Sequence, residues 1–204
     1  GIGALRYLEV RAVQNRPTWG EFLTKDWGGG ALFDLGVHPL AVAMLAADEP
    51  PVSVSAELQG ADDHPTDEHA EVALTFASGL RATVTSSWRG GAVPQWAAQV
   101  ASDTDAVRAE LLPELLLERD GEPIALAPAA TEVPQLEQYG YTGQLEAFLV
   151  AFASGSAPLM DARFGRAVLD VVCAAYTSAR EGGSDVALPF TGPRDRTPLE
   201  LWRG

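Results

Sequence analysis

Apolar and polar residues alternate along a series of short runs between residues 51 and 126, and turn residues separate these runs. The runs are 51–58, 70–77, 80–88, 96–102, 106–112 and 114–126. An alternation of period two predicts strands that bury one face. Ser78-Gly79 and Asp120-Gly121 predict tight hairpins, and strands joined in this way must be antiparallel. The pattern therefore restricts the chain to folds built on one large, mostly antiparallel sheet.

Three further segments space their apolar residues as a helix does. One follows Gly28 to Gly30 and ends near Ala47, the second is 142–154, and the third is 161–181, with Asp161 as a candidate N-cap. Residues 4–13 alternate like a strand, 14–28 are expected to form a loop, and 186–190 a short last strand. This order predicts an α+β fold with helices packed on one face of the sheet. We expect residues 1–204 to form a single domain.

The charge balance limits the partners. The net charge is −14 and the pI about 4.5, so nucleic acid and anionic membrane surfaces would be repelled. No apolar run approaches the ~20 residues that cross a bilayer. The single cysteine, Cys173, excludes an internal disulfide, fits a reducing compartment such as the cytoplasm, and is expected to be a buried, inert thiol. Small molecules and other proteins remain as partners.

Asp34 and His38 are the candidates for chemistry. Residues four apart share one helix face, and a carboxylate beside a histidine can fix its tautomer, raise its pKa or bind a substrate hydroxyl. On spacing alone, a purely stabilising pair is the commoner interpretation. Gly36 and Pro39 make the segment a poor interior for a regular helix, which shifts the balance towards function.

Other polar segments carry weaker signals. Gly28 to Gly30 do not fit a dinucleotide-binding fingerprint and are expected to be a loop. The stretch 61–71 contains His64, His69 and the acidic residues Asp62, Asp63, Asp67 and Glu68, which could bind a metal. Because the stretch lies between two expected strands, we favour a solvated acidic loop and expect no metal site.

Two residues of the expected loop 14–28 are candidates for contacting a substrate. Trp27, like the nearby Trp19 and Phe22, could form the wall of a ligand pocket or anchor the loop to the core. Lys25 is the only lysine in the chain. A lone loop cation is most often solvated, but it could contact an anionic ligand.

The segment "GGGALFDLGVHPL" closely resembles the G-G-G-A-L-x-D-x-G-x-H signature of the glucose-fructose oxidoreductase / inositol dehydrogenase / MocA (Gfo/Idh/MocA) family. The order of the remaining segments is also similar to the family's C-terminal domain: "IGALRYLEVRA" is similar to its first strand, "EHAEVALTFASGLRATVTSSW" to its central hairpin, and the segment from "GYTGQLEAF" onward to its closing helices. The resemblance covers nearly the whole chain.

The resemblance implies the C-terminal domain of a two-domain NAD- or NADP-dependent enzyme that oxidises or reduces a hydroxyl carbon of sugars, inositols or related polyols. The Rossmann domain that binds the cofactor would be absent, so we expect a fragment of a longer protein and no cofactor-binding residues here. His38 would be the acid/base and Asp34 would position the sugar or tune His38. The open sheet face would form a homodimer or tetramer.

Two departures from the family pattern keep a second hypothesis open. The family's E-K-P lysine motif is absent and Lys25 is in the wrong place to replace it, while Ala41 occupies a position where the family often has aspartate. The first hypothesis is a substrate-binding and oligomerisation domain that is inactive alone. The alternative is a non-catalytic module that keeps the fold for dimerisation or ligand sensing.

Overall fold

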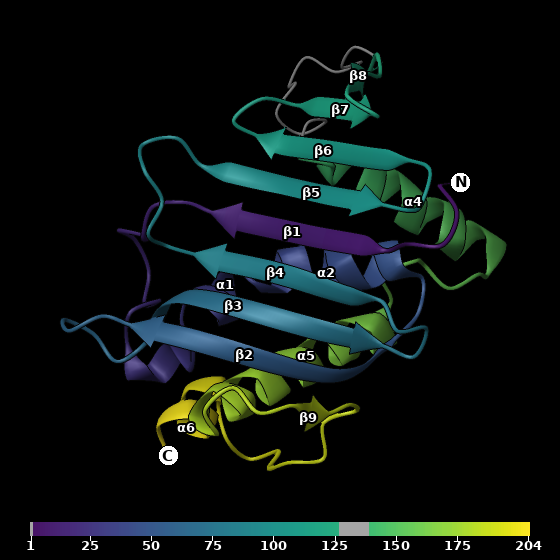
Figure 1. Cartoon of the computed structure of the whole chain (residues 1–204). Helices are drawn as coiled ribbons and strands as arrows, with labels where there is room; N and C mark the ends of the chain where they lie inside the picture. The colour runs from purple at the N-terminus through teal and green to yellow at the C-terminus, as the bar shows by residue number, and fades with distance from the viewer. Residues whose placement is uncertain (1, 127–138) are drawn as a thin grey trace.

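The computed structural model describes residues 2–126 and 139–204, and its centre is a nine-stranded sheet of order β8-β7-β6-β5-β1-β4-β3-β2-β9 (Figure 1). The strands are β1 (Tyr7–Val13), β2 (Pro51–Gly60), β3 (Asp67–Phe76), β4 (Arg81–Ser87), β5 (Gln95–Ala101), β6 (Ala106–Leu112), β7 (Leu116–Arg119), β8 (Glu122–Pro123) and β9 (Val186–Ala187). Among the described strands, β1 and β4 pair in parallel and the other neighbours are antiparallel. The expected mostly antiparallel sheet is confirmed.

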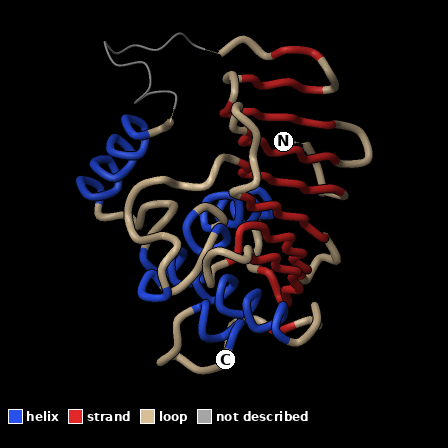
Figure 2. Tube along the Cα trace, turned by 90° about the vertical axis from the view of Figure 1, so that its left-hand side faces the viewer, coloured by secondary structure: helices blue, strands red, loops and turns tan. Residues whose placement is uncertain are grey.

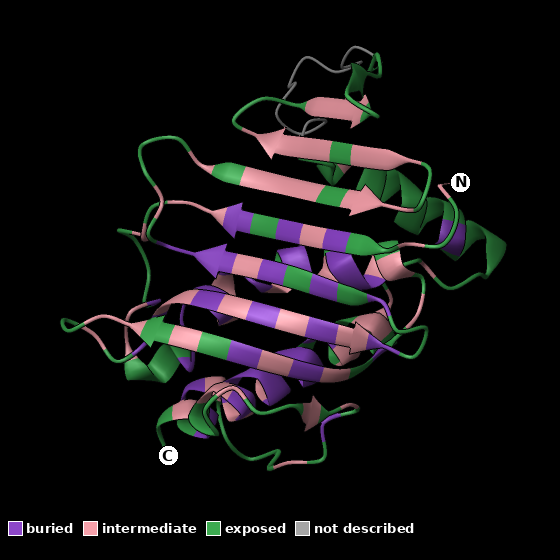
Figure 3. Cartoon of the chain, in the orientation of Figure 1, coloured by how far each residue is buried: buried purple, intermediate pink, exposed green. Residues whose placement is uncertain are grey.

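The alternation along each strand decides which side chains enter the core. In β1, Leu8 and Val10 are almost fully buried, and the paired register places Val84 of β4 and Ala98 of β5 beside Val10 on the same face. The opposite face carries Glu9, Arg11 and other polar side chains. Figure 3 shows this alternation as bands of buried and exposed residues across the sheet.

The described helices all lie on one face of the sheet, as Figures 1 and 2 show from two directions. They are the 3₁₀ helix η1 (Lys25–Trp27), α1 (Ala31–Asp34), α2 (Val37–Ala47), α4 (Tyr141–Ser154), α5 (Ala162–Arg180) and α6 (Pro198–Arg203). Helix α2 contacts β1, β4 and β5, while α5 contacts β2 and α2. The predicted α+β class with helices on one face is therefore confirmed.

Two helix starts show how local sequence sets the boundaries. Asp161 accepts hydrogen bonds from the amides of Arg163 and Phe164, which confirms it as the N-cap of α5. Helix α6 begins with a capping box between Thr197 and Glu200. The sequence of α6 gives no helical signal, because six residues are too few to show a helical period.

The expected helix ending near Ala47 is two helices. Helix α1 ends at Asp34, and α2 begins at Val37 after a break at Leu35 and Gly36. The break places Pro39 in the first turn of α2, where the amide that proline lacks would have no intrahelical partner. The end of the segment was predicted correctly, and Asp48 follows it in the left-handed conformation.

Helix α4 differs from its expected packing. It lies apart from the rest of the helical layer (Figure 2), and Ala151 is its one buried residue. Leu145, Leu149 and Phe152 are exposed, at 64%, 69% and 90%.

Among the described residues no single helix is long and apolar enough to span a membrane. The segments Lys25–Asp34 and Val37–Ala47, bent by 44° relative to each other, meet those criteria only when they are taken as a pair.

Candidate functional site

Asp34 and His38 lie on either side of the helix break. Asp34 is the last residue of α1 and His38 the second residue of α2, so they do not share one continuous helix. The backbone of the break packs closely on α1, since a Cβ atom on Gly36 would lie 2.5 Å from the carbonyl oxygen of Leu32. Only glycine therefore allows α2 to start this near α1. The structure places Asp34 and His38 close enough to interact through charge, but across a helix break rather than along one helix.

His38 lies at the rim of an apolar cavity of about 570 Å³. The cavity is formed between α2 and the helix-facing side of β5, β6 and β7, and its lining includes Val42, Leu45, Trp96, Leu117 and Met160. The ring centroids of His38 and Trp96 are 5.5 Å apart, with 38° between the ring planes. A tilted ring contact of this kind restrains the imidazole, while His38 as a whole stays exposed.

The surroundings shift the pKa values of both groups. Burial lowers the pKa of His38, and the charge of Asp34 offsets part of this shift. Burial raises the pKa of Asp34, opposed by the nearby Trp88 indole and by His38. The two side chains are thus coupled through charge. His38 tends towards its neutral form, which can accept a proton from a hydroxyl group.

Two indole N–H groups lie at this site without a hydrogen-bond partner among the described residues. They are Nε1 of Trp88 and Nε1 of Trp96, both buried atoms. The Trp88 indole lies close enough to Asp34 to lower its pKa without completing a bond of normal geometry. Neither tryptophan was singled out as a site residue from sequence, because both read as apolar residues near strand ends.

Lys25 and Trp27 lie elsewhere. Neither is among the described residues that line the His38 cavity. The Trp27 ring packs on Phe22, with ring centroids 4.6 Å apart, and so anchors the loop. Lys25 lines a different hollow, of about 590 Å³, together with Asp26 and Arg203. Their role in substrate binding stays a prediction.

The expectation for residues 61–71 is partly wrong. Only 61–66 precede the strand, while Asp67, Glu68 and His69 begin β3. Asp67 is fully buried rather than solvated. His64 already has partners, since its Nδ1 is 2.9 Å from the Thr66 hydroxyl and its Nε2 3.3 Å from a Glu68 carboxylate oxygen. The first residues of β3 were not predicted as a strand because the many charged residues in this stretch are more typical of a loop.

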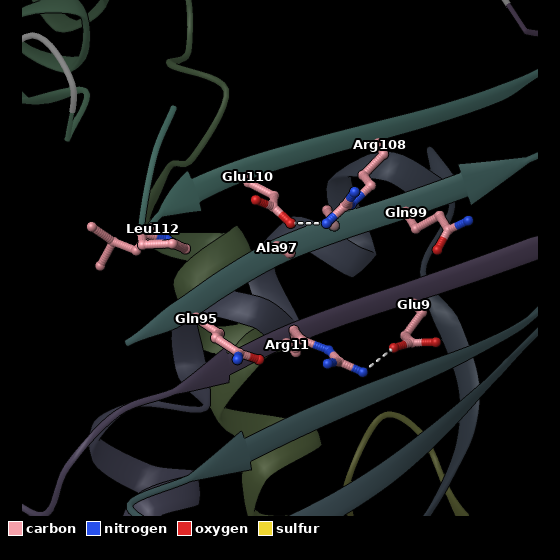
Figure 4. A pocket seen from close by; sticks show the side chains of 10 residues that line it. Glu9, Arg11, Gln95, Ala97, Gln99, Arg108, Glu110 and Leu112 are labelled. Carbon is pink, nitrogen blue, oxygen red and sulfur yellow. Dashed lines mark hydrogen bonds and ion pairs between the residues drawn. The ribbon is translucent and has the colours of Figure 1, made fainter. Parts of the chain in front are cut away.

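The uncovered sheet face has a hollow of about 640 Å³ across β1, β5 and β6. Figure 4 shows alternating charges along it: Arg11 pairs with Glu9 at 2.8 Å, and Arg108 pairs with Glu110. Gln95 and Gln99 lie between these pairs on β5. The face is polar but carries both signs of charge, so the net charge of the chain does not prevent it from meeting a second copy.

The comparisons with known proteins agree with this arrangement. The model of the GFO/IDH/MocA C-terminal domain matches residues 1–103, which is half of the chain. The chain therefore belongs to the Gfo/Idh/MocA family and has the fold of the C-terminal domain of these oxidoreductases. No curated protein matches the sequence significantly.

Several solved structures share the fold. An aldose-aldose oxidoreductase from Caulobacter crescentus complexed with glycerol is 23% identical, with a TM-score of 0.75 over 92% of this chain. Levoglucosan dehydrogenase in complex with NADH and L-sorbose is 18% identical, with a TM-score of 0.78 over 92% of this chain. GenD2 from gentamicin A biosynthesis in complex with NAD is 22% identical, with a TM-score of 0.76, again over 92%. The matches cover 56%, 59% and 56% of those chains, so this chain spans less than two thirds of their length.

Proposed function

We propose that this chain is the substrate-binding and oligomerisation domain of an NAD- or NADP-dependent oxidoreductase acting on a sugar, an inositol or a related polyol. The observation that carries the proposal is His38 in the lining of a cavity, with its pKa lowered by burial and with Asp34 close enough to oppose that shift. The solved structures with a similar fold include complexes with glycerol and with L-sorbose, which supports a polyhydroxylated substrate.

The proposed chemistry of this chain is proton transfer. His38, neutral at the cavity rim, accepts the proton of the substrate hydroxyl during oxidation and returns it during reduction. Asp34 steadies the imidazolium that forms, because its charge already raises the pKa of His38. The contact with Trp96 holds the ring while the proton moves. Each of these proposed roles belongs to a side chain of this domain.

The residues that the structure describes do not fit a dinucleotide. Such a site needs a strand, a glycine-rich turn that approaches the phosphates and a helix within one βαβ unit. Here the glycine-rich turn packs against protein instead: a Cβ atom on Gly30 would lie 2.1 Å from the Asp67 carbonyl oxygen. The proposal therefore assigns the nicotinamide, which supplies or accepts the hydride, to a separate domain of the parent protein, and the chain is expected to be inactive alone.

The uncovered sheet face is the proposed site of self-association. It carries pairs of opposite charges on β1 and on β6, on either side of β5, and no described helix covers it (Figures 1 and 4). In a two-fold dimer the same patch meets itself, so a patch with both charges in a row can be self-complementary. A homodimer or tetramer would follow.

The charge and the single cysteine are consistent with an acidic protein of the cytoplasm.

Titration with a polyol tests the binding part of this proposal. Addition of myo-inositol or glucose to the 204-residue chain should shift the imidazole NMR signals of His38 and the indole signals of Trp96, since both line the cavity rim. His64, which is 5% exposed and already paired, serves as an internal control. Equal shifts at His38 and His64, or none up to the solubility of the polyol, would contradict polyol binding by this domain.

A further inference from the structure

Asp67 caps the N-terminus of α1, although it is distant from that helix in the sequence. The residue that precedes α1 is Gly30, which has no side chain with which to cap the helix. The amide of Leu32, at the second position of α1, donates to Oδ2 of Asp67 at 2.8 Å. Asp67 lies 35 residues further along the chain, at the start of β3. A strand thereby satisfies the free amide of the helix.

Tyr176 extends this connection to α5. Its hydroxyl donates to Oδ1 of Asp67, and the hydroxyl oxygen of Tyr176 accepts a hydrogen bond from the amide of Gly30 at 3.0 Å. Tyr176 and Asp67 are both fully buried. Burial raises the pKa of each group, whereas the hydrogen bonds from Tyr176 and Leu32 oppose the shift at Asp67. An ionisable group is costly in such a place unless all its bonds are made.

The backbone around Gly30 shows how tight the connection is. A Cβ atom at Gly30 would lie 2.1 Å from the carbonyl oxygen and 2.5 Å from the amide nitrogen of Asp67. The Ser86 hydroxyl, on the neighbouring strand β4, donates to the carbonyl of Ala31 at 2.8 Å. The first turn of α1 is thus held from β3, from β4 and from α5.

The anchored first turn of α1 is connected to Asp34 along the helix and to His38 through Gly36. Helix α1 has four residues, too few to be stable alone, so its position depends on these tertiary contacts. Asp34 is two residues beyond the anchored amide of Leu32. The carbonyl of Leu32 in turn packs against Gly36, and the amide of Leu40 in α2 donates to the Gly36 carbonyl at 3.1 Å. The start of α2, with His38, therefore rests on α1.

We propose that Asp67 and Tyr176 are positioning residues for the Asp34–His38 pair. They fix the first turn of α1 against β3 and α5, and through Leu32 and Gly36 they set where His38 meets Trp96. Their importance for catalysis rests on the function proposed above. Their effect on the position of α1 is measurable without substrate or cofactor, so the two proposals can fail separately.

Three variants of the 204-residue chain test the proposal: Tyr176→Phe, Asp67→Asn and Asp67→Ala. The control is Ser178→Ala, which removes another buried hydroxyl of α5 that bonds Ala56 and Ser184 rather than α1. NMR hydrogen exchange measures the amides of Gly30 and Leu32, and a pH titration follows the imidazole of His38. The His38 signals are assigned from the spectrum of His38→Gln, because the chain has three histidines.

We expect Tyr176→Phe to speed exchange of the Gly30 amide about tenfold or more, and Asp67→Ala to do the same for Leu32. Asp67→Asn keeps a carbonyl that can accept from Leu32, so exchange in this variant should lie between Asp67→Ala and the native chain. The pKa of His38 should rise towards its ordinary value in Asp67→Ala and Tyr176→Phe, because burial lowers it in the native chain. Ser178→Ala should change neither readout.

Exchange at Gly30 and Leu32 that changes no more in Tyr176→Phe than in Ser178→Ala, with an unchanged pKa of His38, would overturn the proposal. If Asp67→Ala does not fold, Tyr176→Phe still decides the matter, since it removes one oxygen and keeps the ring. In the parent enzyme a positioning role predicts a lower kcat with little change in KM for Tyr176→Phe. A polyol that fails to bind would count against the proposed function alone, because neither readout requires one.

Discussion

The imidazole of His38 and the indole of Trp96 face each other at a centroid distance of 5.5 Å, although one comes from helix α2 and the other from strand β5. The contact ties the candidate acid/base to the sheet rather than to its own helix alone. It also places one wall of the cavity directly against the ring. The position and the pKa of His38 are therefore properties of the fold around it.

The pKa of His38 provides the first prediction. Burial lowers it below 6.5, and the negative charge of Asp34 raises it. Asp34→Asn removes that charge, so the pKa of His38 should fall further, as measured by NMR titration of the imidazole. In the parent enzyme the acid limb of kcat/KM for oxidation should move to lower pH in the same variant, since the base stays neutral over a wider range.

Asp48→Asn is the matched control for this titration, because Asp48 is an exposed aspartate at the other end of α2 with a left-handed backbone that asparagine tolerates. It should leave the pKa of His38 unchanged. A rise of the pKa in Asp34→Asn would show that Asp34 acts on His38 through something other than its charge.

Gly30 provides a prediction for stability. Gly30→Ala forces a methyl group to within 2.1 Å of the Asp67 carbonyl oxygen, so the backbone of α1 or β3 must move. We expect the free energy of unfolding to fall by about 3 kcal/mol or more, measured by urea denaturation. Gly91→Ala is the control, since a methyl group there meets no atom within 4 Å, and it should change stability by less than about 1 kcal/mol. Equal effects of the two variants would contradict the close packing of Gly30.

The sheet face provides a prediction for assembly. Ala97 pairs with Arg11 on one side and Glu110 on the other, in the middle of the charged hollow. Ala97→Arg should convert a dimer or tetramer into a monomer in light scattering after gel filtration, because it adds bulk and a charge beside Arg11. Ala46→Arg, an exposed position on α2, should not. A native chain that is monomeric at high concentration would remove the basis for this interface.

The sheet could be predicted from sequence because each strand carries its own signal. Residues 70–77 and 80–88 alternate on both sides of Ser78-Gly79, and they form β3 and β4 with that turn. The parallel pairing of β1 with β4 has no such local signal, since it joins strands that are far apart in the sequence. The exposure of α4 was missed for a similar reason: helical spacing reveals which face is apolar but not what lies against it.

The candidate site was predictable only in part. The spacing of Asp34 and His38 selected them as candidates and the family resemblance implied their roles, but neither carried information on Trp96, whose ring comes from another element. Asp67 was misread because a buried aspartate bonded to Tyr176, 109 residues away, looks in the sequence like one more charge in an acidic stretch. Gly36 was recognised as unusual, while its reason, the close approach to Leu32, requires coordinates.

The most direct test of the account is the turnover of His38→Gln in the parent protein, with the domain that binds the nicotinamide in place. The rate of NAD(P)H formation is measured with a polyol substrate, and cofactor affinity is measured separately by fluorescence. We expect kcat to fall by about 10²–10⁴-fold with cofactor affinity unchanged, because in the proposed mechanism this chain supplies the proton acceptor and the other domain the hydride acceptor. Turnover equal to that of the native protein would contradict the assignment of His38 as the acid/base.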